Sequence, residues 1–587
     1  MDYSIYGING PIVKILGKTD LFLHETVNVG NEGLVGEVTS VNSSETVIQV
    51  YENTTGLRPG EPVHGNGTAL SATLGPGLLS GIYDGICRPL TEIEKKSGAF
   101  IGRGINVPTI SLTKKWKLTL KVKSGDVLHE GMIYGTCPET SSVEHRFTVP
   151  VGFEGGVVES TVPNGEYTVE EPIVKVNVGG KTKELTMMTK WPVRQPRPAA
   201  ERLEPTVPLI TGQRVIDSLF PIAKGGAAAI PGGFGTGKTM LQHQLAKWSD
   251  ADIIVYIGCG ERGNEMTQVL EEFSKLVDPK NGKSMLDRTI LIANTSNMPV
   301  AAREASIYTG VTLAEYYRDM GYDVAVMADS TSRWAEALRE ISGRLEEMPA
   351  EEGFPAYLPS RLSAFYERAG YYKTLSGANG SVTIIGAVSP QGNDFSEPVT
   401  QNTKRFIRCF WALDKPLAYA RHYPAINWNT SYSEYSGTLD AWFKEKLSPE
   451  FVSLRTELRK ILGEEASLMD IVKLIGSDLL ADDQKLILDT AKLIRTGFLQ
   501  QNAVVASDTY APLDKQLAMM RAIVRLYDGA RKLIAKQIPV SQIRDSGIYE
   551  KIGRMKFDIS ADNMDKFDAL YADIDRALAA IDEKYNG

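Results

Sequence analysis

Residues 232–239 have the sequence GGFGTGKT, which is a complete Gly-x-x-x-x-Gly-Lys-Thr phosphate loop. A small apolar run precedes it and a helical pattern follows, which is the strand–loop–helix order that the motif requires. Glycines let the backbone N–H groups of such a loop point at phosphate oxygens, and the helix N-terminus attracts the same anion. A glycine-rich turn without a ligand is the alternative. The residues predicted to bind phosphate are Gly232, Gly233, Phe234, Gly235, Thr236, Gly237, Lys238 and Thr239.

Two side chains of this loop have distinct chemistry. The ammonium group of Lys238 can reach the β- and γ-phosphates of a nucleotide. The hydroxyl of Thr239 can ligate the magnesium ion that accompanies those phosphates. The motif therefore predicts a nucleotide site with Mg²⁺ as its cofactor.

Asp329 directly follows an apolar, strand-like run at 323–328. Ligand-facing groups of parallel α/β sheets lie at the carboxyl ends of the strands, so Asp329 is expected to hold Mg²⁺ through water beside Thr239. The alternative is that Asp329 caps the helix that begins near Ser330. The phosphate loop favours the magnesium role.

A second charged group follows the strand-like run 253–257, where the sequence continues to Glu261 and Arg262. Glu261 could orient and deprotonate the water that attacks a γ-phosphate, with Arg262 holding it by an ion pair. A surface Glu–Arg pair at a turn is the alternative. Arg333 lies one helical turn after Asp329 and could contact the γ-phosphate; its alternative is a structural salt bridge.

The elements around these residues indicate several domains. Short strands and glycine or proline turns at 1–70 predict a small β-barrel, followed by a connection at 71–109. Strand patterns at 110–190 predict an inserted β-rich domain. Strands alternate with helices over 191–437, which predicts a parallel α/β nucleotide-binding domain, and 438–587 has a helical period. The proline-rich segment 191–198 is expected to be a stiff, extended linker.

Composition limits the function classes. A net charge of −8 argues against a generic nucleic-acid surface, and no apolar run approaches the length of a membrane-spanning helix. The N-terminus has no pattern of a secretion signal, so a cytoplasmic protein is expected. The four cysteines are scattered, which predicts reduced, buried side chains rather than disulfides or zinc ligands.

Taken together, several motifs resemble the catalytic A subunit of V/A-type rotary ATPases. They are the phosphate loop and the segments 211–217, 258–267, 327–337 and 389–394. The resemblance covers essentially the whole chain. It implies a RecA-like nucleotide-binding domain, and the β-rich insertion is similar to the "bulge" of these subunits.

The resemblance implies roles for the charged residues. Glu261 would be the general base, with Arg262 as its neighbour. Lys238 would bind phosphate, Asp329 would hold the metal's water shell, and Arg333 would contact the γ-phosphate. The reaction implied is ATP hydrolysis, or synthesis from ADP, coupled to proton or sodium movement through a separate membrane sector.

The resemblance also implies an adenine site and shows where this chain departs from its relatives. Tyr423 matches the aromatic residue that stacks on adenine, and a core tyrosine is the alternative. Val504 stands where relatives often have a phenylalanine as the second wall. Gly233 replaces a usual proline, and Thr236 replaces a redox-sensitive cysteine of eukaryotic relatives, which indicates a bacterial or archaeal enzyme.

The stretch 431–434 informs assembly, because it ends in Glu434 where non-catalytic partner subunits carry an arginine that acts across the interface. We therefore expect an alternating hexamer of three copies of this chain and three of a B-type partner. Central-stalk subunits of D and F type and peripheral-stalk subunits of E and G type are the other implied partners. The membrane sector would be contacted indirectly, at the cytoplasmic face of the membrane, and no nucleic acid is expected.

Three alternatives remain at this point. Secretion ATPases share the core but are shorter and lack the insertion at 110–190. A Rho-like helicase should have a basic or aromatic single-strand-binding N-terminal domain, and 1–70 has no such cluster. A non-catalytic nucleotide-binding subunit should lack some of Lys238, Glu261 and Asp329, which are all present here.

Overall fold

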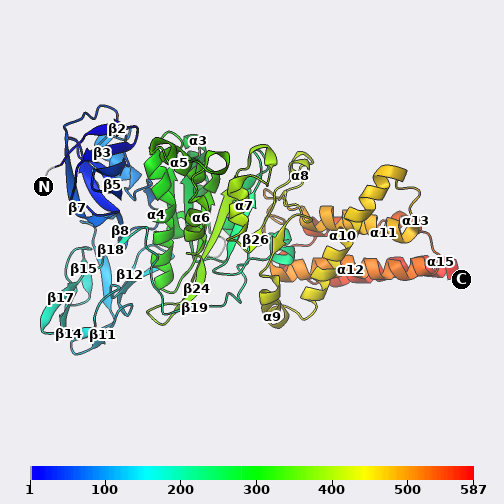
Figure 1. Cartoon of the computed structure of the whole chain (residues 1–587). Helices are drawn as coiled ribbons and strands as arrows, with labels where there is room; N and C mark the ends of the chain where they lie inside the picture. Colours follow the sequence, from blue (N-terminus) through cyan, green and yellow to red (C-terminus); the bar gives the residue numbers. More distant parts are fainter. Residues whose placement is uncertain (1–2, 99, 279–280, 587) are drawn as a thin grey trace. The chain divides into compact units, whose positions relative to one another are not determined.

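The computed structural model of the chain describes residues 3–98, 100–278 and 281–586, and it divides into two compact units (Figure 1). The first unit comprises Met1–Glu204, Lys224–Ala227 and Ala251–Ile407. The second comprises Pro205–Ala223, Ala228–Asp250 and Arg408–Gly587. The segment predicted to be the nucleotide-binding domain therefore contributes to both units.

The first unit begins with an antiparallel barrel. Its strands have the order β1-β7-β4-β5-β6-β3-β2. The first residues of the chain pair with β7 and then with β3, so they join the two edges of the sheet and close it. Alternate side chains point inward, and Val27, Val38 and Ile48 are fully buried. The strands are β1 Tyr3–Ser4, β2 Gly7–Asn9, β3 Ile12–Leu16, β4 Glu25–Val29, β5 Leu34–Val41, β6 Glu45–Val50 and β7 Pro62–Ala69.

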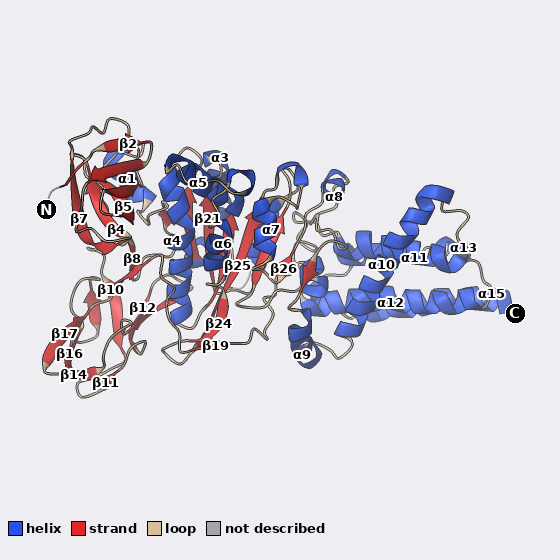
Figure 2. Cartoon of the chain, in the orientation of Figure 1, coloured by secondary structure: helices blue, strands red, loops and turns tan. Residues whose placement is uncertain are grey.

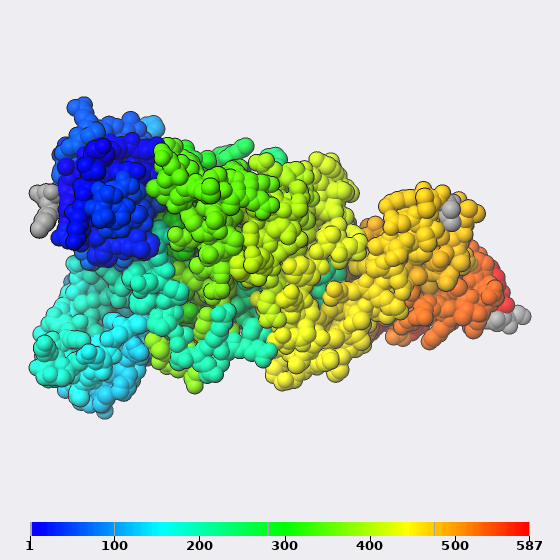
Figure 3. Space-filling view, viewed as in Figure 1, coloured from blue at the N-terminus to red at the C-terminus, as the bar shows by residue number. Residues whose placement is uncertain are grey.

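The inserted segment has its own two antiparallel sheets, with the orders β13-β12-β10-β15 and β11-β14-β16-β17. The strands β8 (Ser71–Leu74) and β18 (Thr189–Pro192), which lie before and after the insertion in the sequence, pair with each other. In Figure 3 the insertion, coloured cyan, adjoins the blue barrel and can be distinguished from it. Its strands are β10 Trp116–Leu120, β11 Val127–Leu128, β12 Ile133–Pro138, β13 Glu144–Thr148, β14 Gly156–Thr161, β15 Gly165–Tyr167, β16 Val174–Val178 and β17 Lys181–Leu185.

A parallel sheet forms the rest of the first unit, with the order β25-β23-β21-β22-β9. Its central strands are buried along almost their whole length and are mostly apolar, as expected for a sheet covered on both faces. The strands are β9 Ile82–Tyr83, β21 Ile253–Cys259, β22 Thr289–Asn294, β23 Asp323–Asp329 and β25 Asn379–Val388, with β19 Glu201–Leu203 and β24 Gly370–Lys373 antiparallel at one side. Its helices are α1 Leu90–Ser97, α3 Gly263–Lys275, α4 Val300–Asp319, α5 Thr331–Arg344, α6 Leu358–Tyr366 and α7 Pro398–Lys404.

Helix α4 is buried along almost its whole length. It packs on β21, β23 and β25 and also contacts β8. His145 of the insertion contacts Tyr316 of α4 through Nε2 at 2.9 Å and Glu139 through Nδ1 at 2.7 Å. The contact with Tyr316 ties the insertion to the helix that packs on the parallel sheet.

The segment 191–198, predicted to be a stiff linker, is fixed to two elements by ion pairs. The Arg194 guanidinium donates to Glu37 of the barrel at 2.9 and 3.1 Å and to Glu304 of α4 at 3.0 and 2.7 Å. Burial alone would raise the pKa of Glu37. The charge of Arg194 and hydrogen bonds from His24, Arg194 and Tyr51 outweigh burial and lower this pKa to about 2.

Replacing Arg194 by methionine is expected to lower local stability by about 3–5 kcal/mol, because Glu37 and Glu304 lose their shared cation while buried. Hydrogen exchange of barrel amides measures the change without requiring the whole chain to unfold in one step. Since the folded pKa of Glu37 is below its ordinary 4.5, its stabilisation is present above pH 4.5 and is lost as the pH falls towards 2. The control Lys14→Met removes an exposed pair with Glu45 and should cost under about 1 kcal/mol; equal losses in both variants would contradict the prediction.

The second unit combines a few strands with a helical C-terminal region (Figure 2). β20 (Ala227–Pro231) pairs in parallel with β26 (Cys409–Phe410), and β27 (Tyr432–Ser433) is antiparallel to β26. Helices α12 and α15 pack along each other, and α10 packs on α11 and α12. The helices are α2 Lys238–Trp248, α8 Lys415–Tyr419, α9 Ser436–Lys446, α10 Phe451–Ile475, α11 Asp482–Leu493, α12 Leu513–Ala535, α13 Val540–Asp545, α14 Ile548–Asp558 and α15 Lys566–Asn586.

All four cysteines are buried, as predicted, and each is a free thiol in the structure. In the ranges that the structure describes, no helix is long and apolar enough to cross a membrane.

Candidate functional site

The phosphate loop lies in the second unit, between the buried strand β20 and the start of α2. Gly235 and Gly237 have φ values of 79° and 90°, a left-handed conformation that favours glycine. Gly237 immediately precedes the first helical residue. The loop therefore has the backbone that turns a strand into a helix whose N-terminus faces the loop.

Two side chains of the loop donate hydrogen bonds to backbone carbonyl oxygens of the same loop. Lys238 Nζ donates to the carbonyl oxygens of Gly232 at 2.7 Å and Gly233 at 3.0 Å. The Thr236 hydroxyl also donates to Gly233 O, at 2.8 Å. Phe234 is at the exposed tip. The ammonium group of Lys238 is thus held against the loop that is predicted to bind phosphate.

A pocket of about 800 Å³ adjoins the loop in the second unit. Gly235 and Gly237 of the loop line it together with Tyr423 and Val504. Tyr423 packs close to the loop, since a Cβ added at Gly237 would lie 3.4 Å from its ring. Tyr423 is 42% exposed and is therefore not a core tyrosine, whereas Val504 is 90% exposed. The structure brings Tyr423 to the loop and leaves Val504 at the pocket's edge.

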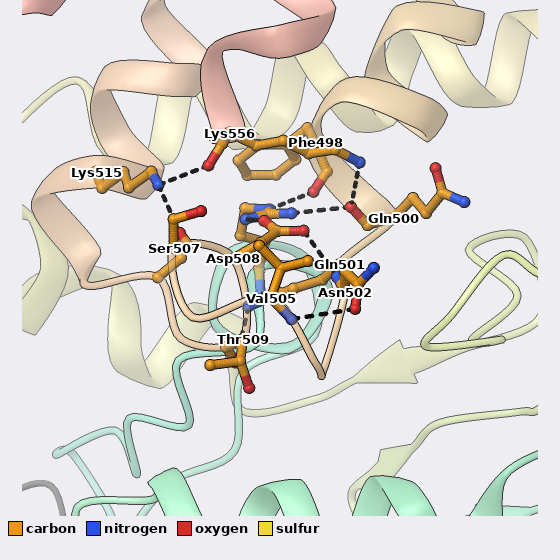
Figure 4. A network of polar contacts seen from close by, with 12 residues as sticks. Phe498, Gln500, Gln501, Asn502, Val505, Ser507, Asp508, Thr509, Lys515 and Lys556 are labelled. Carbon is orange, nitrogen blue, oxygen red and sulfur yellow. Dashed lines mark hydrogen bonds and ion pairs between the residues drawn. The ribbon is translucent and has the colours of Figure 1, made fainter. Parts of the chain in front are cut away.

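The loop that carries Val504 is held by a buried polar network (Figure 4). Arg214 donates to Asp508 at 2.7 Å and to the backbone oxygen of Gln500 at 2.9 Å. The Gln501 side chain accepts from Arg214 N at 2.9 Å and donates to the carbonyl oxygen of Gly212 at 2.8 Å. One edge of the pocket is therefore rigidly attached to the segment 211–217.

Glu261 and Asp329 lie in the first unit at the carboxyl ends of neighbouring strands. β21 and β23 are parallel, and Gly258 is opposite Asp329 in their register. Parallel strands present their carboxyl ends at one edge, so the two carboxylates share that edge. Asp329 is 3% exposed and its Oδ2 accepts a hydrogen bond from the Tyr256 hydroxyl at 3.1 Å.

The surroundings of Glu261 raise its pKa and so favour the protonated carboxyl group. Burial, the charge of Asp329 and the neighbouring Glu265 together raise the pKa of Glu261 to about 8, while Arg333 opposes the shift. A half-buried carboxyl with a pKa near neutrality is typical of an acid–base group at a functional site.

The two arginines predicted at this edge behave differently. Arg333 of α5 pairs with Glu336 at 2.9 Å and is half exposed. Arg262 directly precedes α3, its side chain is exposed, and within the described residues it forms no ion pair with Glu261. The Glu261–Arg262 pair that the sequence allowed is therefore not seen among the described residues, whereas the charge of Arg333 lowers the pKa of Glu261. Gly260 must stay small here, since a Cβ on it would lie 2.7 Å from the Cβ of Arg333.

Several residues of the pocket beside the phosphate loop, and of the sheet edge that carries Glu261 and Asp329, could not be predicted from the sequence or were not. Glu265 influences Glu261, and its spacing of four residues at the start of a helix was a usable signal. Tyr256 reaches Asp329 only because β21 and β23 are neighbours. Phe557 and Lys556 of α14 line the pocket beside Tyr423, and nothing in their local sequence indicates this position.

Family models cover most of the chain. Residues 212–433 match the nucleotide-binding domain of the ATP synthase alpha/beta family, and residues 5–67 match the beta-barrel domain of that family. Residues 107–194 match the barrel-sandwich domain of the ATP synthase alpha/beta subunits. Residues 440–544 match the C-terminal domain of V and A type ATP synthases. These matches confirm the predicted fold class.

Full-length relatives are also similar. The chain is 57% identical over 585 residues to the V-type ATP synthase alpha chain of Halothermothrix orenii, covering 99% of this chain and 98% of the relative. It is 54% identical over 584 residues to the corresponding chain of the A-type ATP synthase of Methanopyrus kandleri, with the same coverage. Among solved structures it resembles EscN, an assembled ATPase of the type III secretion system of enteropathogenic E. coli. The TM-score is 0.63 at 21% identity, covering 89% of this chain and 100% of EscN, and this likeness concerns the fold alone.

Proposed function

This chain belongs to the family of alpha (A) subunits of V-type and A-type ATP synthases, and we propose that its phosphate loop, Glu261 and Asp329 carry out the ATP chemistry of that family. The chain is accordingly a catalytic subunit of a rotary ATPase, and its activity is ATP hydrolysis or synthesis coupled to ion transport. The full-length relatives favour this function over the secretion and helicase alternatives. The observation that best supports the proposed site is the pocket of about 800 Å³ that the phosphate loop shares with Tyr423.

In the proposed mechanism the loop binds the phosphates first. Backbone N–H groups of residues 232–239 and the N-terminus of α2 receive phosphate oxygens, and Lys238 exchanges its backbone acceptors for the β- and γ-phosphates. Tyr423 contacts the base. Binding in this way fixes the γ-phosphate for in-line attack.

Glu261 is the proposed general base. Its carboxylate accepts a proton from the attacking water, and in the synthetic direction it returns that proton. Arg333 is proposed to leave Glu336 and contact the γ-phosphate, which offsets charge that builds up there. Arg262 is adjacent to the proposed base in sequence and its side chain is exposed, so we propose no direct contact with the γ-phosphate for it.

The residues present fit a magnesium ion. Asp329 is a buried carboxylate whose charge raises the pKa of Glu261, so a cation is favoured at this edge. Mg²⁺ keeps several water ligands and usually takes one or two protein oxygens besides phosphate. We propose that Thr239 ligates it and that Asp329 holds its water shell. When bound, it would neutralise charge on the β- and γ-phosphates.

Family membership implies a multisubunit complex. We propose that three copies of this chain alternate with three B-type subunits, and that central-stalk (D and F type) and peripheral-stalk (E and G type) subunits complete the assembly. The transported ion would be a proton or sodium, moved by a membrane sector that this chain contacts indirectly. The proposed location is the cytoplasmic face of the cell membrane.

Lys238→Ala is expected to weaken MgATP binding about 10- to 100-fold, because charge-assisted hydrogen bonds to the phosphates are lost. Calorimetric titration of the purified chain measures the change. Lys247→Ala, at the other end of α2, is the matched control and should bind as the wild type. Unchanged binding by Lys238→Ala would remove the phosphate loop from the proposed site.

A further inference from the structure

The pocket beside the phosphate loop has an aromatic residue from the C-terminal helical region. Phe557, in the last turn of α14, lines it together with Tyr423, and its ring is 43% exposed. A half-exposed phenylalanine at a pocket wall leaves apolar surface uncovered. An exposed aromatic face is the kind of surface on which a nucleobase stacks.

Val504 does not provide a comparable surface. Its side chain is aliphatic and 90% exposed. Its backbone is held by Asn502, whose side-chain oxygen accepts from Val504 N at 2.9 Å. Since the loop is fixed by this turn and by the Arg214 network, Val504 stays at the edge of the pocket. Within the lining, Tyr423 and Phe557 are thus the aromatic residues available to a base.

The position of Phe557 is set by its neighbour Lys556. Lys556 Nζ donates to the carbonyl oxygens of Thr496 at 2.7 Å and Gln500 at 2.9 Å, and it lies 5.0 Å from the centre of the Phe557 ring. Lys515 of α12 donates to Lys556 O at 2.9 Å, as Figure 4 shows. The side chain and the backbone carbonyl of Lys556 are therefore both hydrogen-bonded. These bonds fix the backbone that carries the Phe557 ring.

We propose that Phe557 is the second aromatic wall of the nucleobase site, and that it takes over the contact which Val504 cannot make. This inference rests on the proposed function, since it assigns a further residue to the same nucleotide. It makes α14 a direct part of the binding site. Nucleotide binding would then be sensed by the helical region through Phe557 and Lys556.

The proposal predicts that substitution of Phe557 weakens the binding of ligands that carry a nucleobase and leaves the binding of phosphate groups unchanged. Phe557→Ala should weaken MgATP binding by the full-length chain about tenfold and leave the binding of inorganic tripolyphosphate, which has no base, unchanged. Phe557→Trp should retain the affinity for MgATP. Val504→Phe in the Phe557→Ala chain should recover part of it, because an aromatic ring returns to the pocket's edge. Tyr585→Ala, at a similarly exposed aromatic residue of α15 outside the pocket, is the control and should bind as the wild type.

Two results would overturn the inference. One is MgATP binding by Phe557→Ala within twofold of the wild type while Tyr423→Ala is impaired. The other is an equal loss of MgATP and tripolyphosphate binding, which would mean that the substitution disturbs the fold rather than the base contact. Failure of the proposed function would look different, since then Lys238→Ala and the wild type would bind MgATP equally well.

Discussion

ATP turnover by the purified chain is expected to rise about 10³-fold or more when the B-type partner is added. A chain that acts alone must supply its own cation to the γ-phosphate of a neighbouring copy. At the position where the resemblance implies an arginine in the proposed B-type partner, this chain has Glu434, which is exposed and pairs with Arg408 at 3.6 Å. An arginine supplied in trans stabilises transition-state charge and accelerates phosphoryl transfer by about 10³–10⁵-fold.

Steady-state hydrolysis by the chain alone and by the reconstituted complex measures this effect. A partner whose interface arginine is replaced by alanine should assemble but give little stimulation. Arg408→Ala in this chain tests whether the nearby arginine supplies the charge instead, and stimulation by the partner should persist. Full turnover by the chain alone would refute the trans-acting arginine.

Glu261→Gln is expected to lower turnover about 10²- to 10⁴-fold while MgATP binding stays within about twofold of the wild type. Glutamine keeps the shape of the side chain but cannot accept a proton from the attacking water. It also removes a carboxyl group from a half-buried edge that already holds Asp329 and Glu265, so the variant should fold at least as stably. This variant therefore distinguishes a role of Glu261 in catalysis from a role in nucleotide binding.

Single-turnover hydrolysis and calorimetric binding, measured on the same complex, test this prediction. Glu265→Gln is the matched control, because Glu265 acts on Glu261 rather than on the water. It should reduce turnover far less, by about tenfold or less. If Glu261→Gln retained turnover near the wild-type rate, the general base would have to be another group.

Much of the fold could be predicted because its signals are local. The strand–loop–helix order at 225–247 needs only near neighbours in sequence, and the structure has β20, the loop and α2 at those positions. The buried parallel strands at 253–257 and 324–328 were similarly visible as apolar runs, which are followed by the candidate carboxylates Glu261 and Asp329. The ion pairs of the segment 191–198 could not be predicted, because they join Arg194 to residues far away in sequence.

The sequence by itself determined the chemistry of this protein. The types and spacing of the phosphate-loop residues predict a nucleotide site, and the strand-end position of Asp329 predicts a place for Mg²⁺ beside it. The role of Glu261 as a base is what the family resemblance implies. Only the tertiary structure decided their surroundings. The pKa of Glu261 and the place of Phe557 beside Tyr423 depend on burial and on contacts between distant segments. Such contacts follow from packing, which no local pattern of residues encodes.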